Sequence, residues 1–351
     1  MSLPSPNISC LWRGITLTAV CCLFLFSFEP STIAQQEDQA LAAARSLILE
    51  NKNREAIAQL KLLAARNPGM NGIQRELGIA YYHEADYLEA AWYLEQARRE
   101  NPEDRDAVQL LGLSYYFSGK PDQAIPALEE VRLWNPNTNI DAIYTLGLCY
   151  VMTSNYAQAL ETFAHLYRLD PESAPAHLLL GRILIRQGFD PIAKQEVLRA
   201  QALSPRLPLV HFTLGELYAY GAEYPKAAQE FERELEINPG YAPALNHLGD
   251  AYWRLKRYED AERVLQGSIW LDSTMSEPYA SLGKVLMAKG QFAQAERALQ
   301  RAIAVDSGSY TAHYLLGQLY WKIGKADAGE REMKIAAQIQ QLQGQNPTHP
   351  R

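Results

Sequence analysis

Three histidines are the strongest candidates in the sequence for a metal-binding site. His177, His211 and His313 share one position of a repeated sequence pattern, and neutral imidazoles are common ligands of transition metals. Equivalent residues on neighbouring stacked helices stand about 8–10 Å apart, which is too far for two imidazoles to share one ion without help. We therefore expect these histidines to pack inside the protein, and we expect no metal site.

The sequence motifs of common enzymes do not occur in the chain. It has no phosphate-binding glycine loop, no His-Glu-x-x-His, no Cys-x-x-Cys and no Gly-x-Ser-x-Gly. Three of its cysteines lie in the N-terminal leader, so only Cys149 remains in the expected mature chain, where we interpret it as a small buried residue. We therefore expect no catalytic residue and no cofactor, and we interpret the protein as non-enzymatic.

The elements that would position any site repeat along the chain. Leu-Gly dipeptides recur in steps of 34 residues, with one step of 35, and their glycines stand at 78, 112, 147, 181, 215, 249, 283 and 317. A fixed period of this length is typical of stacked repeat architectures. The longer step falls between Pro136 and Gly147, so we place the extra residue in the loop Asn137-Thr138-Asn139.

Each unit is predicted to form two amphipathic helices. Apolar residues recur at spacings of three and four, and a small or polar residue seven positions after the glycine marks the turn between the helices. Proline after the second helix ends it in five units. Ala44 replaces the glycine in a degenerate first unit. Glycine and alanine have small size in common rather than freedom of φ, so these positions predict close helix packing.

The pattern Leu-Gly-x-x-Tyr, followed by Tyr or Phe, Ala and Pro, resembles the tetratricopeptide repeat, although the family's first-helix tryptophan is absent. The resemblance covers about residues 37 to 341. It implies an all-α, right-handed superhelical solenoid of about nine antiparallel helix pairs with a concave groove. The predicted solenoid runs over 41–343, in units of about 37–70, 71–104, 105–138, 139–173, 174–207, 208–241, 242–275, 276–309 and 310–343.

The two ends of the chain are expected to lie outside the solenoid. A fourteen-residue apolar stretch, Ile15 to Phe28, follows Arg13 and precedes Thr32-Ile33-Ala34. These features predict a signal peptide over 1–34, a short linker over 35–40 and an exported protein, periplasmic or secreted. The alternative is an uncleaved segment that anchors the chain in the inner membrane. Residues 344–351 are expected to form a disordered tail.

Composition narrows the class of partner. The chain is 48% hydrophobic and 21% charged, as in proteins with an ample core, and its net charge is −7. A nucleic-acid binder usually carries a basic surface, so we expect no nucleic-acid partner. We also expect no stable membrane insertion after signal cleavage.

The groove implied by the resemblance is lined by the first helix of each pair. Its expected lining is apolar and aromatic in the first half of the chain and mixes aromatic with charged residues in the second half. The residues that we expect to contact a partner are Tyr82, Tyr116, Phe117, Tyr144, Arg182, Arg186, Phe212, Tyr220, Asn246, Trp253, Arg254, Lys284, Tyr314 and Trp321.

A charge series within this groove has two interpretations. One position of four successive units holds Arg182, Glu216, Asp250 and Lys284. These residues either form the ion pairs Arg182–Glu216 and Asp250–Lys284, each worth about 0–1 kcal/mol if exposed, or present a polar ledge to a peptide. The sequence leaves both open.

The predicted function is that of a non-enzymatic exported scaffold. We expect the groove to bind a peptide or protein partner, in envelope assembly or secretion in a bacterium. The alternative is a polysaccharide- or peptidoglycan-handling accessory that binds glycan through the groove aromatics. The paired Lys and Asn with which some relatives hold C-terminal carboxylates are not found at the corresponding positions here.

Overall fold

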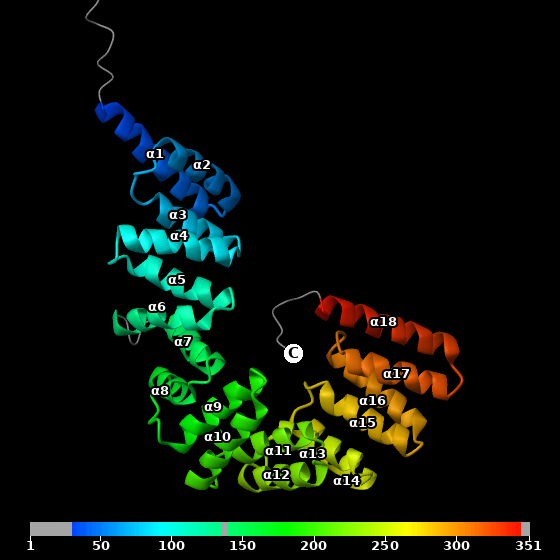
Figure 1. Ribbon diagram of the computed structural model, residues 1–351. Helices are drawn as coiled ribbons and strands as arrows, with labels where there is room; N and C mark the ends of the chain where they lie inside the picture. The colour runs from blue at the N-terminus through cyan, green and yellow to red at the C-terminus, as the bar shows by residue number, and fades with distance from the viewer. Residues whose placement is uncertain (1–29, 135–138, 345–351) are drawn as a thin grey trace, which may run out of the picture. The chain divides into compact units, whose positions relative to one another are not determined.

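The computed structural model describes residues 30–134 and 139–344, and the regular secondary structure in those ranges is helical throughout. Consecutive helices form antiparallel pairs, as the ribbon shows (Figure 1). The first helices are α1 (Pro30–Leu49), α3 (Ile73–His83), α5 (Arg105–Phe117), α7 (Ile140–Met152), α9 (Ala174–Arg186), α11 (Val210–Tyr220), α13 (Ala242–Arg254), α15 (Glu277–Ala288) and α17 (Tyr310–Lys322). The second helices are α2 (Asn53–Arg66), α4 (Tyr87–Glu100), α6 (Pro121–Trp134), α8 (Tyr156–Leu166), α10 (Asp190–Leu203), α12 (Tyr224–Ile237), α14 (Tyr258–Leu271), α16 (Phe292–Val305) and α18 (Ala326–Gly344). The prediction of an all-α repeat solenoid is confirmed.

The chain divides into two compact units within α6. Unit 1 is Met1–Glu130 and unit 2 is Val131–Arg351. In unit 1, α3 packs against α4 and α4 against α5. In unit 2, each helix from α9 to α18 packs against the next, so every hairpin stacks on its neighbour and the core runs along the stack.

The repeated glycines are points of close approach between the two helices of a pair. A Cβ atom on Gly215 would lie 2.5 Å from Cε1 of Phe231, and one on Gly78 would lie 2.5 Å from Cγ of Leu94. In all eight glycine-containing repeats the residue that closes this contact stands sixteen positions after the glycine. None of the eight glycines has a positive φ. The predicted close packing, rather than a special backbone conformation, therefore explains them.

The predicted turns fall at the expected positions. The residue seven positions after each key glycine has a positive φ, including non-glycine residues such as Ala85 at 59° and Lys256 at 59°. Left-handed backbone costs an L-residue about 1–2 kcal/mol. The fold therefore imposes this turn even where the sequence has no glycine there.

Tyrosine hydroxyls link successive repeats. Tyr115 donates a hydrogen bond to the carboxylate of Glu95 in unit 1, and Tyr252 donates one to Glu232 in unit 2. Both tyrosines are buried. Burial, reinforced by the glutamate, raises the pKa of Tyr252 to about 12. In these two repeats the tyrosine three residues after the key glycine therefore packs in the core and also bonds to the preceding repeat.

The helix α8 is shorter than the other second helices. It has 11 residues, whereas α4, α10 and α12 have 14. It ends at Leu166, and the chain then turns through Arg168, whose φ is 57°. The loop that leads into α9 is consequently longer than in the neighbouring repeats.

The predicted boundaries at the chain ends differ in part from the structure. Residues 35–40, expected as a linker, belong to α1, which begins at Pro30. The apolar leader before Pro30, residues 137 and 138 of the predicted insertion and the tail after Gly344 lie outside the described residues. Within the described residues, no helix is long and apolar enough to cross a membrane.

Candidate functional site

The fourteen predicted groove residues all lie on first helices. Tyr82 is on α3, and Tyr116 and Phe117 are on α5, in unit 1; the other eleven are in unit 2. The two units therefore offer two separate sets of side chains, and each set has its own geometry.

The unit 1 residues form an aromatic cluster. Phe117 stacks on Tyr87 with ring centroids 4.8 Å apart, and it contacts Tyr116 at 5.2 Å and Tyr82 at 6.4 Å. Phe117 is 49% exposed. These rings are packed largely against one another, and the cluster presents one exposed edge to solvent.

Phe212 was predicted to contact a partner in the groove, and its position in the structure contradicts this. It is only 7% exposed and contacts Tyr241 and His247, with ring centroids 5.1 Å and 5.2 Å away. It also packs against Phe231, which closes the contact with the key glycine. The aromatic side chain at this position fills the core, so it is not available to a partner.

Trp253 also differs from the exposed anchor that was expected. It is half-buried and packs against the unit 2 core. The Lys284 ammonium lies 3.7 Å from the centre of its ring, and the Arg254 guanidinium lies 5.1 Å from it. Lys284 also forms an ion pair with Asp250. The predicted Asp250–Lys284 pair is therefore present, and it covers the indole ring.

The other predicted pair, Arg182–Glu216, does not form within the described structure. Instead a pocket of about 460 Å³ lies between α9 and α11. We call it the α9–α11 pocket; it is lined by Leu179, Arg182, Ile183, Ile185, Arg186, Glu216 and Tyr220.

The α9–α11 pocket combines an unpaired acid with two bases and an exposed ring. Glu216 is half-buried, and this burial raises the pKa of its carboxyl group, an effect that the charge of Arg182 opposes. Arg186 donates a hydrogen bond to the hydroxyl of Tyr144 on α7 at 3.2 Å. Tyr220 is 73% exposed. The pocket therefore offers both hydrogen-bond donors and acceptors beside a flat apolar surface.

Two of the predicted groove residues, Tyr314 and Trp321, lie on α17 and make contacts within the protein. Tyr314 stacks on Tyr310 at 5.7 Å. Trp321 is 50% exposed, and a Cβ atom on Gly329 would lie 2.5 Å from its indole. The close approach of this ring explains why glycine replaces the usual alanine at position 329.

Asn246, on α13, is half-buried, and its side-chain oxygen lacks a hydrogen bond within the described residues.

The three histidines form the polar contacts that sequence reasoning missed. In each, Nδ1 lies 2.6 Å from a glutamate oxygen of the second helix of the same pair: His177 with Glu196, His211 with Glu230, and His313 with Glu332. The sequence carried a signal, since among the units from Gly78 onward only these three have glutamate nineteen residues after that position. No three potential metal-ligating side chains converge within the described ranges.

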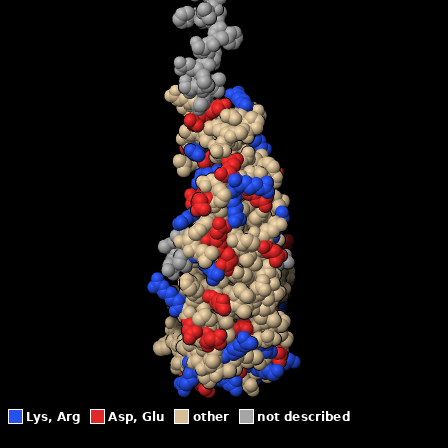
Figure 2. Space-filling view, turned by 60° about the vertical axis from the view of Figure 1, so that its left-hand side comes forward, with Lys and Arg blue, Asp and Glu red and all other residues tan. Residues whose placement is uncertain are grey.

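Charges of both signs are mixed on the face of the molecule seen in Figure 2. Figure 2 shows Lys and Arg interspersed with Asp and Glu, without a broad area of one sign.

Comparison with known proteins gives matches along much of the chain. Two family models described as Tetratricopeptide repeat match it, one at residues 41–105, 144–206 and 281–341 and the other at 81–147, 116–166 and 222–269. The BBSome complex member BBS4 of Bos taurus is 28% identical over 169 residues, which are 48% of this chain and 32% of that protein. The chain thus spans about a third of the length of this curated relative.

Several solved structures match the chain at low identity. The APC/C hetero-tetramer Cut9–Hcn1 matches with a TM-score of 0.44 and 18% identity, over 80% of this chain and 55% of that one. MamA of Desulfovibrio magneticus RS-1 matches with a TM-score of 0.43 and 18% identity, over 48% and 96%. YrrB, a TPR protein with an unusual peptide-binding site, matches with a TM-score of 0.42 and 20% identity, over 52% and 93%.

Proposed function

The chain belongs to the tetratricopeptide-repeat family, and from this premise we propose that it is a scaffold whose unit 2 binds an extended peptide of a partner protein at the α9–α11 pocket. Proteins of this fold are typically non-enzymatic scaffolds that act through protein–protein interaction. The bound peptide would lie across α9 and α11 beside Tyr220.

The observation that carries this proposal is the unpaired carboxylate of Glu216. A half-buried charge without a partner destabilises the fold. The side chain that could neutralise it, Arg182, lines the same pocket but does not pair with it. A ligand that approaches both residues can supply the missing hydrogen bonds, so the unpaired state favours a binding role over a structural one.

The chemistry of the pocket suits an extended backbone. The guanidinium groups of Arg182 and Arg186 only donate hydrogen bonds, whereas the Glu216 carboxylate only accepts them. An extended peptide exposes carbonyl oxygens and N–H groups alternately along its length, so it can satisfy both kinds of group at once. Tyr220 adds an exposed aromatic surface for one of its side chains.

We also propose that the protein acts after export, in envelope assembly or secretion. The support is the apolar stretch before Glu29 and the small-residue pattern that ends at Ala34. Determination of the N-terminus of the protein purified from its native cell tests this. A chain that begins at Gln35 is expected, and an intact N-terminal Met in the purified protein would contradict cleavage.

Glycan binding is a second candidate because two of the predicted groove aromatics of unit 2 are exposed. Tyr220 and Trp321 both present half or more of their surface to solvent, and aromatic faces of this kind can stack on sugar rings. Binding of purified peptidoglycan fragments that is lost in Tyr220→Ala would favour this candidate. The mixed donors and acceptors of the α9–α11 pocket favour the peptide.

Photo-crosslinking locates the binding site directly. A peptide is first selected from a random library on the purified full chain, and benzoylphenylalanine is then placed either at position 220 or at position 254. Both positions are exposed, but only Tyr220 borders the α9–α11 pocket. At least fivefold more crosslinked peptide is expected from position 220. Stronger crosslinking from position 254, or equal yields, would overturn the proposed location.

A further inference from the structure

The three His–Glu pairs of unit 2 differ in their second ring nitrogen. Nε2 of His211 lies 3.0 Å from the carbonyl oxygen of Pro205, and Nε2 of His313 lies 3.2 Å from that of Ser307. In both cases the carbonyl belongs to the residue six positions earlier, in the loop before the helix. Both ring nitrogens of these two histidines therefore face an acceptor, and a ring that donates to both must carry a proton on each nitrogen.

His177 lacks this second contact. The equivalent carbonyl belongs to Pro171, and within the described structure Nε2 of His177 makes no hydrogen bond to it. The shortened α8 gives a physical reason, because the chain leaves this helix at Leu166 and turns through Arg168 before it reaches Pro171. The loop that supplies the carbonyl in the other two repeats thus follows a different path here.

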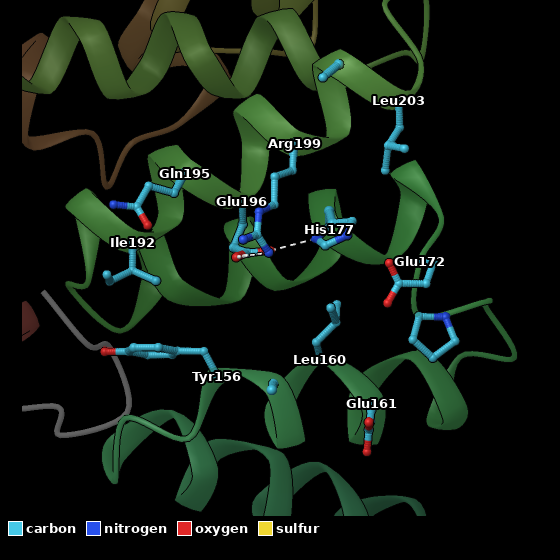
Figure 3. A pocket seen from close by; sticks show the side chains of 13 residues that line it. Tyr156, Leu160, Glu161, Glu172, His177, Ile192, Gln195, Glu196, Arg199 and Leu203 are labelled. Carbon is cyan, nitrogen blue, oxygen red and sulfur yellow. Dashed lines mark hydrogen bonds and ion pairs between the residues drawn. The ribbon is translucent and has the colours of Figure 1, made fainter.

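A cavity lies beside His177, between α8 and α10. The cavity has a volume of about 780 Å³, and His177, which is only 5% exposed, lies in its wall (Figure 3). We call it the α8–α10 cavity; it is lined by Tyr156, Ala157, Leu160, Glu161, Pro171, Glu172, His177, Ile192, Gln195, Glu196, Arg199, Ala202 and Leu203. It is lined mainly by second helices, whereas the α9–α11 pocket is lined by first helices.

The His177–Glu196 contact determines what Nε2 can do. A carboxylate only accepts hydrogen bonds, so at 2.6 Å the Nδ1 of His177 carries the proton and donates it to Glu196. In the neutral imidazole Nε2 then holds a lone pair. No acceptor among the described residues faces Nε2 of His177, so this ring needs a proton only on Nδ1 and in that form presents a buried hydrogen-bond acceptor to the cavity.

The charges and apolar surface around this acceptor complement one kind of side chain. Three carboxylates line the cavity, Glu161, Glu172 and Glu196, against a single base, Arg199, which lies 3.6 Å from Glu196. Aliphatic side chains, among them Leu160, Ile192 and Leu203, supply the remaining wall. An acidic rim over an apolar wall suits a long side chain with an aliphatic stem and a cationic head.

We propose that the α8–α10 cavity receives a lysine or arginine side chain of a partner protein. The stem packs on the aliphatic wall, and the cationic head donates hydrogen bonds to Nε2 of His177 and to Glu172. An anionic ligand does not fit the excess of carboxylates, and a metal ion lacks a third converging ligand within the described ranges. This site is independent of the α9–α11 pocket and can exist whether or not that pocket binds a peptide.

Imidazole nitrogen resonances test the proposal with two internal controls. The full chain, labelled with ¹⁵N-histidine, is titrated with the peptide acetyl-Gly-Gly-Lys-Gly-Gly-amide and with matched peptides that carry Arg, norleucine or Glu in place of Lys. The Lys or Arg peptide is expected to shift the Nε2 resonance of His177 saturably. The Nε2 resonances of His211 and His313, which are bonded to carbonyls, should not move.

A double variant tests whether the carboxylates of the cavity contribute to binding. Glu161→Gln with Glu172→Gln alters only exposed side chains, so the fold and the His177–Glu196 contact are retained, and the affinity for the Lys peptide should fall at least threefold. The proposal is overturned if norleucine or Glu peptides shift His177 as strongly as Lys and Arg do, if all three histidines respond alike, or if no peptide shifts His177.

Discussion

Two pairs of equivalent charged positions in unit 2 have opposite outcomes. Asp250 and Lys284 form an ion pair, whereas Arg182 and Glu216, at the same position of the two preceding repeats, leave a pocket between their helices. Three residues after Asp250 stands Trp253, and the Lys284 ammonium lies over its ring. Three residues after Arg182 stands Ile185, which offers no such surface. We infer that the neighbouring ring, and not the charge pattern alone, stabilises the closed arrangement.

The removal of Trp253 should have the largest effect on stability. We expect Trp253→Ala to lower the free energy of unfolding by about 2–3 kcal/mol, because a half-buried indole is lost from the core contact and from beneath Lys284. Urea unfolding followed by circular dichroism measures the change. The exposed Tyr220→Ala is the matched control, with an expected change within about 0.5 kcal/mol. Equal losses of unfolding free energy in both variants would show that the Trp253 indole does not stabilise the closed Asp250–Lys284 arrangement.

The removal of the two pocket arginines should have the next largest effect, on binding rather than stability. Arg182→Ala with Arg186→Ala is expected to weaken a selected peptide at least tenfold, about 1.4 kcal/mol, because both guanidinium donors are lost from the α9–α11 pocket. Titration calorimetry measures the affinity. A peptide affinity within twofold of that of the unaltered chain would show that the two arginines do not contribute to binding.

Glu216→Gln should slightly stabilise the free protein at neutral pH. Burial raises the pKa of Glu216 above its ordinary value of 4.5, so the folded state binds this proton more tightly than the unfolded state. Stability therefore falls as pH rises from about 4.5 through the raised pKa. The glutamine variant lacks that fall and should gain roughly 1 kcal/mol or less.

Thermal unfolding from pH 4 to pH 8 tests this prediction. The difference in Tm between Glu216→Gln and the unaltered chain should grow with pH over that window. Asp250→Asn is the control, since Asp250 has a cationic partner. A difference for Glu216→Gln that is independent of pH would contradict an unpaired buried carboxylate.

The smallest effect is expected from the closed pair itself. A partly exposed ion pair contributes about 0–1 kcal/mol, so Asp250→Asn should change stability by no more than that and leave peptide affinity within twofold. A double-mutant cycle with Lys284→Met isolates the pair. A coupling energy well above about 1 kcal/mol would show that the pair, rather than the indole, determines the closed arrangement.

Much of the fold could be predicted from the sequence because it depends on short-range spacing. The glycine at position 215 and its contact with Phe231 follow from a period that repeats eight times, and the turn at Lys256 follows from the same period. Side-chain exposure could not be predicted in the same way, because it depends on neighbours from other repeats. Phe212 and Trp253 were predicted as groove residues, but Tyr241, which directly precedes α13, packs on Phe212, and Lys284 from the following repeat covers Trp253.

The site was predictable only as a choice between two interpretations. The sequence placed Arg182 and Glu216 at equivalent positions but did not decide whether they pair. The glutamates that hold the three histidines were visible in the sequence at a fixed spacing, yet only the structure shows that His177 lacks the second contact that His211 has.

The central claim is that the α9–α11 pocket, which contains Arg182 and Glu216, binds the partner, whereas the closed pair Asp250–Lys284 does not. Its most direct test is the affinity of one selected peptide for three chains: the unaltered protein, Arg182→Ala with Arg186→Ala, and Asp250→Asn with Lys284→Met. Our account predicts a loss of at least tenfold in the first variant and a change of less than twofold in the second. Equal losses in both variants, or a loss confined to the second, would contradict it.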